Sequence, residues 1–166
     1  MNQAVISLGS NKGDRKFYLK EALRQLSLRV GGVKRVSSVY ETVPWGMENT
    51  DNFYNAALIL ETELNPFQLL HALLEIELEL GRTRSANGYA PRTIDLDVLF
   101  FNNEVLETEE LTVPHPHIPK RNFVLIPLLE IAPDLLHPVL GKTIKELLDI
   151  SPDDSCPMKK EGLLDC

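Results

Sequence analysis

The residues from Pro91 to Phe101, PRTIDLDVLFF, constrain the fold most, because they are typical of one strand with two chemically different faces. The run is rich in β-branched and aromatic residues, begins at a proline and is followed by the turn-forming pair Asn102-Asn103. Side chains alternate along a strand, so Asp95 and Asp97 share one face, with Cα atoms about 7 Å apart, while their apolar neighbours face the core. The pattern predicts a half-buried strand whose other face carries two carboxylates.

Two carboxylates at this spacing repel each other and resist burial, so we expect a cation between them, most simply a divalent metal or a pair of metals. Arg92 comes just before Asp95 and Asp97, and an arginine beside a carboxylate pair suits a metal-bound phosphate. The alternative is that both aspartates are solvated on an exposed sheet face and paired with nearby arginines.

The loop before this strand holds Arg82, Arg84 and Arg92 with no acidic residue between them. Such a group can clamp phosphates, or it can be solubilising charge. Glu77, at the margin of the apolar stripe of the preceding helix, either supports a polar site or lies on a solvated face. We favour the phosphate clamp because the arginines directly precede the carboxylate pair.

Two further stretches carry candidate chemistry. His115-Pro116-His117 could bind zinc, but its prolines hold an extended turn and no third ligand is evident, so we favour His115 and Arg121 as phosphate donors. Trp45 lies in the long loop 41–51, where it either covers a ring-shaped ligand or anchors the loop to the body of the protein.

The order of predicted elements is β-α-β-β-α-β, which predicts an α+β fold of the ferredoxin-like class, an antiparallel sheet with helices packed on one face. A helical and loop-rich appendix follows. We expect a single domain over residues 1–150 and a flexible tail over 151–166, where Pro, Asp, Ser, Lys and Glu dominate. The elements come from these stretches: strands 4–8, 33–40, 53–60 and 91–101, helices 14–30, 65–80, 123–131 and 142–148, and a hairpin at 104–113.

Composition narrows the class of protein. The 166 residues carry a formal net charge of -7, which argues against nucleic acid or an anionic membrane as the main partner. The sequence has no long apolar run and no signal-peptide pattern, so we expect a soluble, cytoplasmic protein. The two cysteines, Cys156 and Cys166, suggest neither a disulfide framework nor a zinc site.

Six sequence blocks follow one another between the first strand and Pro133: Leu8-Gly9-Ser10-Asn11, Tyr40-Glu41-Thr42, Phe53-x-Asn55-Ala56-Ala57, Glu77-x-x-x-Gly81-Arg82-x-Arg84, Pro91-Arg92-Thr93-Ile94-Asp95-Leu96-Asp97, and Pro114-His115-Pro116 with Arg121-x-Phe123. Together they closely resemble the 6-hydroxymethyl-7,8-dihydropterin pyrophosphokinases of folate biosynthesis. The resemblance implies an ATP-dependent diphosphokinase that transfers the β,γ-diphosphate of ATP to the pterin hydroxymethyl oxygen and releases AMP.

The resemblance also implies roles for individual residues. Two Mg²⁺ ions are held by Asp95 and Asp97, which are catalytic together with Arg82 and Arg92. The co-substrate ATP is bound by Glu77, Arg82, Arg84, Arg92, Thr112, His115 and Arg121. The pterin is bound by Gly9, Thr42, Val43, Trp45, Phe53, Asn55, Tyr89, Asp95 and Phe123, with the two phenylalanines on its faces and Asn55 and Thr42 on its amide edge.

Some positions depart from the family pattern. Glu110 stands where some members carry an arginine near ATP, Pro116-His117 replaces a tyrosine of some members, and Tyr89 holds a place that is often tryptophan. These changes bear on lid details and on ATP affinity. Two alternatives remain open: another two-metal phosphohydrolase, and a ferredoxin-like ligand-binding module. We expect ATP and the pterin as the only partners, and a monomer or weak dimer.

Overall fold

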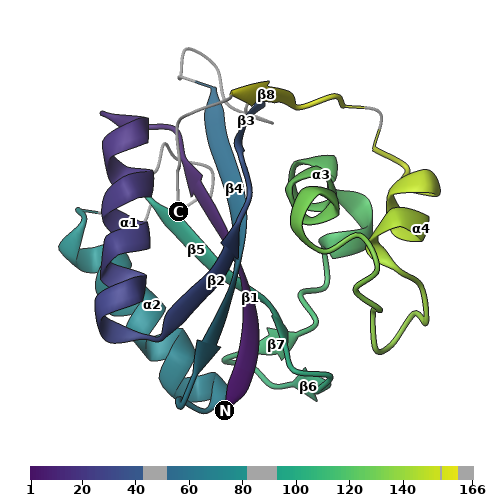
Figure 1. Cartoon of the computed structure of the whole chain (residues 1–166), viewed down its shortest axis with the longest axis horizontal. Helices are drawn as coiled ribbons and strands as arrows, with labels where there is room; N and C mark the ends of the chain where they lie inside the picture. Colours follow the sequence, from purple (N-terminus) through teal and green to yellow (C-terminus); the bar gives the residue numbers. More distant parts are fainter. Residues whose placement is uncertain (43–51, 82–92, 154, 161–166) are drawn as a thin grey trace.

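The computed structural model describes residues 1–42, 52–81, 93–153 and 155–160. Its centre is a six-stranded sheet of order β5-β1-β4-β3-β8, in which β2 also pairs with β4, and a separate hairpin joins β6 to β7 (Figure 1). The strand pairs within the described part of the chain are all antiparallel. The elements are β1 (Asn2–Ser10), α1 (Arg15–Arg29), β2 (Gly32–Val36), β3 (Val39–Thr42), β4 (Phe53–Thr62), α2 (Pro66–Glu79), β5 (Asp95–Phe101), β6 (Leu106–Glu107), β7 (Thr112–Val113), the 3-10 helix η1 (Ile118–Lys120), α3 (Asn122–Ile131), α4 (Ile144–Asp149) and β8 (Met158–Lys160).

The two long helices begin where their capping residues predict. The Asp14 carboxylate accepts a hydrogen bond from the Phe17 amide at the start of α1. At the start of α2, Asn65 and Gln68 form a reciprocal capping box, with Pro66 at the first helical position. These local signals confirm the predicted starts of both helices.

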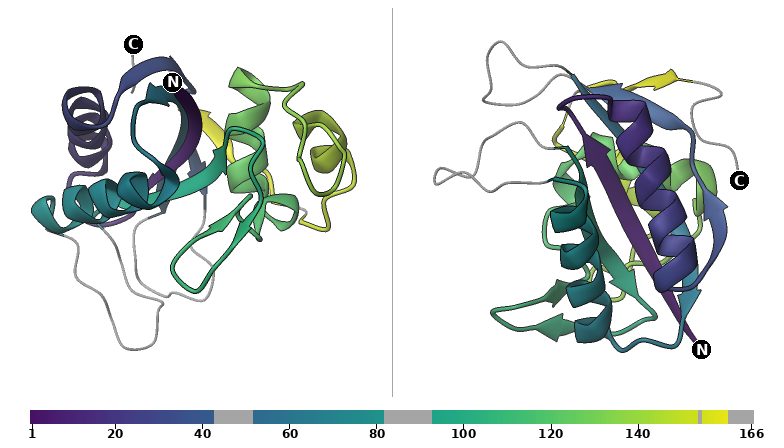
Figure 2. Two further views of the ribbon diagram at one scale, coloured as in Figure 1. Left: turned by 90° about the horizontal axis from the view of Figure 1, so that it is seen from below. Right: turned by 90° about the vertical axis from the view of Figure 1, so that its left-hand side faces the viewer.

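The helices form a layer on each face of the sheet. α1 and α2 cover one face, while α3 and α4 lie on the other (Figures 1 and 2). Alternation sorts the strand residues accordingly: Leu8 and Leu96 join the core under α1 and α2, whereas Val5 and Leu99 join the core under α3 and α4. The mixed fold with an antiparallel sheet and four helices is therefore as predicted, but helices occupy both faces.

The predicted strand 33–40 is divided into β2 and β3. Between them, the Ser37 amide donates to the Ala57 carbonyl at 2.8 Å, and the Ser37 hydroxyl accepts from the Ala57 amide at 2.9 Å. The register against β4 shifts across this point, from Val36 opposite Leu58 to Tyr40 opposite Asn55. A serine hydroxyl thus replaces one backbone group of the ladder, as at a β-bulge.

The predicted tail contains a strand. Met158 and Lys159 of β8 pair with Glu41 and Tyr40 of β3, so part of the segment that was expected to be a flexible tail forms a strand. The composition of this segment is polar, but its backbone finds partners on a distant strand, which local sequence does not reveal. No helix of the described ranges has the length and apolar character needed to span a membrane.

Candidate functional site

The candidate site lies at one end of the sheet, where β1 runs between β4 and β5. Gly9 of β1 stands opposite Asn55 on one side and Asp95 on the other. A methyl group at Gly9 would lie 2.9 Å from Asn55 Oδ1, 3.7 Å from Phe53 Cδ1 and 4.0 Å from Asp95 Cβ. Four of the predicted site residues therefore meet at a point that only a glycine leaves open.

The carboxylate pair belongs to the sheet face on which α3 and α4 pack. Asp95 and Asp97 are half-buried, and the alternating residues Leu96 and Val98 are buried in the opposite core. The face between α3 and the end of the sheet thus holds two carboxylates fixed by a paired strand. The predicted alternation is confirmed.

The carboxylates suit a hard cation that keeps other ligands. The described residues contain no group of three or more His, Cys, Asp or Glu side chains able to hold a metal by themselves. Mg²⁺ is commonly held by one or two carboxylates, with water and substrate phosphates completing its shell. The Asp95 and Asp97 pair therefore fits a Mg²⁺ ion that arrives with a phosphate ligand better than a closed protein site.

The Glu77 carboxylate of α2 binds the backbone of this strand. Its side chain is only 3% exposed, so the solvated-face alternative is wrong. Its Oε2 accepts the Leu96 amide at 2.8 Å, between the two aspartates in sequence. A buried carboxylate is unfavourable unless it is hydrogen-bonded. The bond to the Leu96 amide therefore stabilises the position of β5 beside α2. The sequence pattern showed only that Glu77 lies at the margin of the apolar stripe of α2. It could not show the burial of Glu77, because the helical pattern does not reveal where β5 crosses α2.

The amide side of the site is formed by neighbouring β4 and β3. Asn55 is 5% exposed, and its Nδ2 donates to Thr42 Oγ1 at 2.9 Å. Thr42 stands opposite the half-buried Phe53 in the same strand pair. A hydrogen-bonding amide beside an aromatic ring can recognise a flat heterocycle that has a polar edge.

His115 and Arg121 lie on the α3 side of the site. The His115 amide donates to the Leu99 carbonyl at 2.9 Å, which ties this segment to β5. Burial, then the positive charges of His117 and Arg121, lower the pKa of His115 to about 4, against an opposing effect of Asp95. Because its Nδ1 accepts the His117 amide at 3.2 Å, the neutral ring carries its proton on Nε2 and can donate from there.

Phe123 is half-buried in the first turn of α3, and the Arg121 guanidinium carbon lies 5.4 Å from its ring centroid. A cation over an aromatic face is a favourable arrangement that also fixes the ring. Thr112 is half-buried at the first position of β7. Glu110 contacts His71 of α2, in an exposed ion pair.

Six predicted site residues lie outside the described residues: Val43, Trp45, Arg82, Arg84, Tyr89 and Arg92. Their roles stay predictions.

Sequence reasoning missed two contacts that shape the site. The Arg15 guanidinium donates to the Asn52 carbonyl at 2.8 Å and stacks at 4.0 Å on the Tyr54 ring, which fixes the chain directly before Phe53. Asp153 of the supposed tail accepts the Asn122 amide at 2.8 Å, directly before Phe123. Neither contact has a local sequence signal, because each joins residues more than thirty positions apart.

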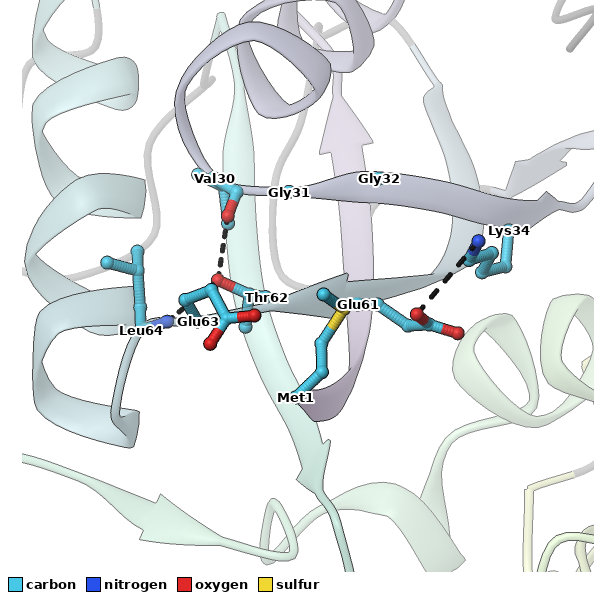
Figure 3. A pocket seen from close by; sticks show the side chains of 9 residues that line it. All are labelled: Met1, Val30, Gly31, Gly32, Lys34, Glu61, Thr62, Glu63 and Leu64. Carbon is cyan, nitrogen blue, oxygen red and sulfur yellow. Dashed lines mark hydrogen bonds and ion pairs between the residues drawn. The ribbon is translucent and has the colours of Figure 1, made fainter.

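A separate hollow of about 330 Å³ opens at the other end of β1 and β4 (Figure 3). Its wall includes the Thr62 hydroxyl, which donates to the Val30 carbonyl, and the exposed pair Lys34–Glu61. None of the predicted site residues lines it. Its lining consists of Met1, Val30, Gly31, Gly32, Lys34, Glu61, Thr62, Glu63 and Leu64.

Comparison with known proteins agrees with the six sequence blocks. A model of the 7,8-dihydro-6-hydroxymethylpterin-pyrophosphokinase (HPPK) family matches residues 5–133. The 2-amino-4-hydroxy-6-hydroxymethyldihydropteridine pyrophosphokinase of Bacillus subtilis is 52% identical over 131 residues, which cover 78% of either chain. The enzyme of the same name from Aquifex aeolicus is 41% identical over 146 residues, covering 88% of this chain and 90% of that one.

A solved structure of wild-type HPPK-DHPS from Plasmodium falciparum with pteroate superposes with a TM-score of 0.74 at 20% identity. The match covers 89% of this chain but only 44% of that one, and at this identity it shows the fold alone. The matches to the two relatives, by contrast, extend over most of both chains, and the family match over residues 5–133 includes the blocks that meet around Gly9. The chain therefore belongs to the 7,8-dihydro-6-hydroxymethylpterin-pyrophosphokinase family.

Proposed function

We propose that the chain transfers the diphosphate group of ATP to the hydroxymethyl oxygen of 6-hydroxymethyl-7,8-dihydropterin, giving AMP and the pterin diphosphate for folate synthesis. Family membership supports the reaction. The observation that carries it in this chain is the meeting of Asn55, Phe53 and Asp95 around Gly9. The Asn55 amide, which can hydrogen-bond the polar edge of a heterocycle, thereby lies next to a carboxylate suited to a metal-bound polyphosphate.

On the pterin side, Asn55 and Thr42 bind the amide edge, and Phe53 and Phe123 cover the two ring faces. The hydrogen bond between Asn55 and Thr42 supports this role, because it orients the amide before substrate arrives. Gly9 and Asp95 complete the pocket. The proposed lid residues Val43, Trp45 and Tyr89 would exclude water from the reacting phosphate.

On the ATP side, Asp95 and Asp97 are the residues that would hold Mg²⁺. A bound Mg²⁺ supplies charge neutralisation on the polyphosphate and makes an attacking hydroxyl easier to deprotonate. His115 donates from Nε2, and its low pKa keeps it neutral, so it contributes a hydrogen bond rather than a charge. Arg121 and the predicted clamp residues Arg82, Arg84 and Arg92 neutralise the phosphates, with Thr112 beside them. Glu77 contributes to the ATP side through the backbone of β5, at Leu96.

A two-metal phosphohydrolase and a ligand-binding module are both disfavoured by the same geometry. In a phosphohydrolase, water replaces the pterin. Such a reaction does not explain why Asn55 is oriented by Thr42 beside the Phe53 ring. A ligand-binding module without catalysis does not explain why two carboxylates, Asp95 and Asp97, are half-buried side by side on one strand face.

Incubation with ATP, Mg²⁺ and the hydroxymethyl-dihydropterin tests the proposal directly. We expect AMP and pterin diphosphate in equal amounts, and no AMP when the pterin is omitted. Release of ADP or inorganic phosphate without pterin would point to the hydrolase, and absence of any turnover to the module.

We also propose finer features that belong to this function. The sheet order supports a ferredoxin-like arrangement, and we propose a single domain that contains the expected range 1–150 together with β8. We propose two Mg²⁺ ions per active site, a monomer or weak dimer, and a cytoplasmic location. Titration of Mg²⁺ into the complex with a non-hydrolysable ATP analogue gives the metal count, and light scattering gives the mass.

A further inference from the structure

The segment formed by residues 151–153 and 155–160, here named the C-terminal strap, contacts the start of α3. The Asn122 amide donates to Asp153 Oδ2 at 2.8 Å, and Asn122 Nδ2 donates to the carbonyls of Asp153 and Ser155, both at 2.9 Å. Asp153 Oδ1 in turn accepts the Ser155 amide at 2.8 Å. Both donor groups of Asn122 are therefore directed at the strap.

These contacts lie between two proposed substrate-binding residues. Asn122 is the first residue of α3 and only 7% exposed, and it is flanked by Arg121 and Phe123. Arg121 occupies the N-cap position but makes no side-chain cap hydrogen bond. The Asp153 carboxylate supplies that function from a distant part of the chain, because it accepts an amide hydrogen that the helix leaves without an internal partner.

The other end of the strap reaches the opposite wall of the site. β8 pairs with β3, with Met158 opposite Glu41 and Lys159 opposite Tyr40 (Figure 1). Thr42, the proposed pterin contact, is the next residue of the same strand. The strap thus joins the strand that carries Thr42 to the helix that carries Phe123.

Burial acts to raise the pKa of Asp153, but the hydrogen bonds from the Asn122 and Ser155 amides outweigh it and lower the pKa. The carboxylate is therefore ionised when it holds the helix. An ionised acceptor binds an amide more strongly than a neutral one.

We propose that Asp153 is a positioning residue of the pterin site, which acts through Asn122 to hold Phe123, the proposed ring contact at the start of α3, in the position that the pterin requires. The proposal rests on the function proposed above. It goes beyond the family relationship, because the strap lies after residue 133, where the family match ends.

Steady-state kinetics of two substitutions test the proposal. Asp153→Ala removes both acceptor oxygens, and we expect the KM for the pterin to rise roughly tenfold, the scale of a lost hydrogen bond to a charged group. Asp153→Asn keeps one carbonyl acceptor, so a smaller rise of about threefold is expected. The kcat should stay within about twofold, because Asp95 and Asp97 lie on β5, whereas the hydrogen bonds of the strap described above are made to α3 and β3.

A structural role alone would give a different pattern. Loss of folded protein lowers the apparent kcat and leaves the KM unchanged, so an unaltered KM in both variants would overturn the proposal. Asp149→Ala, an exposed aspartate at the end of α4, is the matched control and should change neither constant.

Hydrogen exchange gives a readout that does not depend on activity. The Asn122 amide should exchange at least tenfold faster in Asp153→Ala than in the unchanged protein, while amides of α1 keep their rates. Equal protection at Asn122 would contradict the contact itself. If the unchanged protein forms no AMP from ATP and pterin, the proposed function fails, while the exchange result still decides whether Asp153 holds α3.

Discussion

At the scale of single residues, the candidate site depends on the absence of a side chain at Gly9. Its two neighbours across the sheet are Asn55 and Asp95, and the face they share is also that of Asp97. A side chain at position 9 would occupy the space between the amide and the carboxylate. The absence of a side chain at position 9 thus leaves the proposed pterin position open between Asn55 and Asp95.

Gly9→Ala should therefore weaken pterin binding. Its methyl group would lie 2.9 Å from Asn55 Oδ1, so Asn55 must move and its hydrogen bond to Thr42 is strained. We expect the KM for the pterin to rise by about tenfold and the free energy of unfolding to fall by about 1–3 kcal/mol. Gly32→Ala is the matched control, since nothing lies within 4 Å of the added methyl group there.

Asp97→Ala should abolish nearly all turnover while the protein stays folded. The change removes a proposed Mg²⁺ ligand from a half-buried position on the polar face and leaves the apolar core of β5 unchanged. Thermal unfolding checks the fold, and the Mg²⁺ dependence of AMP formation checks the role. Asp134→Ala, at an exposed aspartate after α3, serves as the control. An Asp97→Ala variant with unchanged kcat would refute the metal role.

At the scale of elements, α3 is fastened to the edge of the sheet by one acidic side chain. Glu130 accepts hydrogen bonds from the Ser38 amide and from the Ser38 and Tyr40 hydroxyls. Burial, and then the contact with Glu130, raise the pKa of Tyr40, so its hydroxyl stays a donor. Helix α3 therefore meets β3 at Glu130 near its C-terminal end, and the strap ties its N-terminal end to the same strand.

Glu130→Ala should lower the free energy of unfolding by about 1–2 kcal/mol, since three donors lose their acceptor at a site that water can reach in part. Urea unfolding measures the change. The exposed Glu109→Ala is the control and should stay within about 0.5 kcal/mol of the unchanged protein. Equal stability of the two variants would show that Glu130 does not hold α3.

Prediction from sequence succeeded where the physical cause is local. The starts of α1, α2 and α4 follow from Asp14, Asn65 and Thr143, whose side chains cap the first turns. The faces of β5 follow from alternation as far as Leu99, but Leu99 and Phe100 both join the core under α3 and α4, where the register against β1 shifts. The burial of Glu77 and the contact of Asp153 with Asn122 could not be predicted, because both are made by backbone amides that are distant in sequence.

At the scale of the whole molecule, two histidines, the buried His137 and the half-buried His115, make stability depend on pH. His137 is 5% exposed, and its Nδ1 accepts the amides of Val139 and Leu140 at 3.2 and 3.1 Å. Burial lowers its pKa, and burial also lowers that of His115 to about 4. The folded protein therefore favours neutral rings, whereas the unfolded chain takes up protons near pH 6.5.

Stability should be highest above about pH 6.5 and fall as the pH is lowered from there toward 5, because the unfolded state then binds more protons than the folded state. The unfolding midpoint in urea, measured at pH 7.5, 6.5, 5.5 and 5.0, checks this. In His137→Asn the protein should be less stable at pH 7.5, and its stability should depend less steeply on pH. A pH profile identical to that of the unchanged protein would assign the effect to other groups.

The pairing of β8 with β3 has one more consequence, for the behaviour of shortened chains. An uncovered outer strand presents a row of unsatisfied backbone amides and carbonyls, on which strands of neighbouring molecules readily add. Met158–Lys160 covers β3 in this way, because it pairs with Val39, Tyr40 and Glu41. Proteolytic cleavage after α4 would remove β8 and expose the backbone amides and carbonyls of β3, so we expect the shortened chain to self-associate.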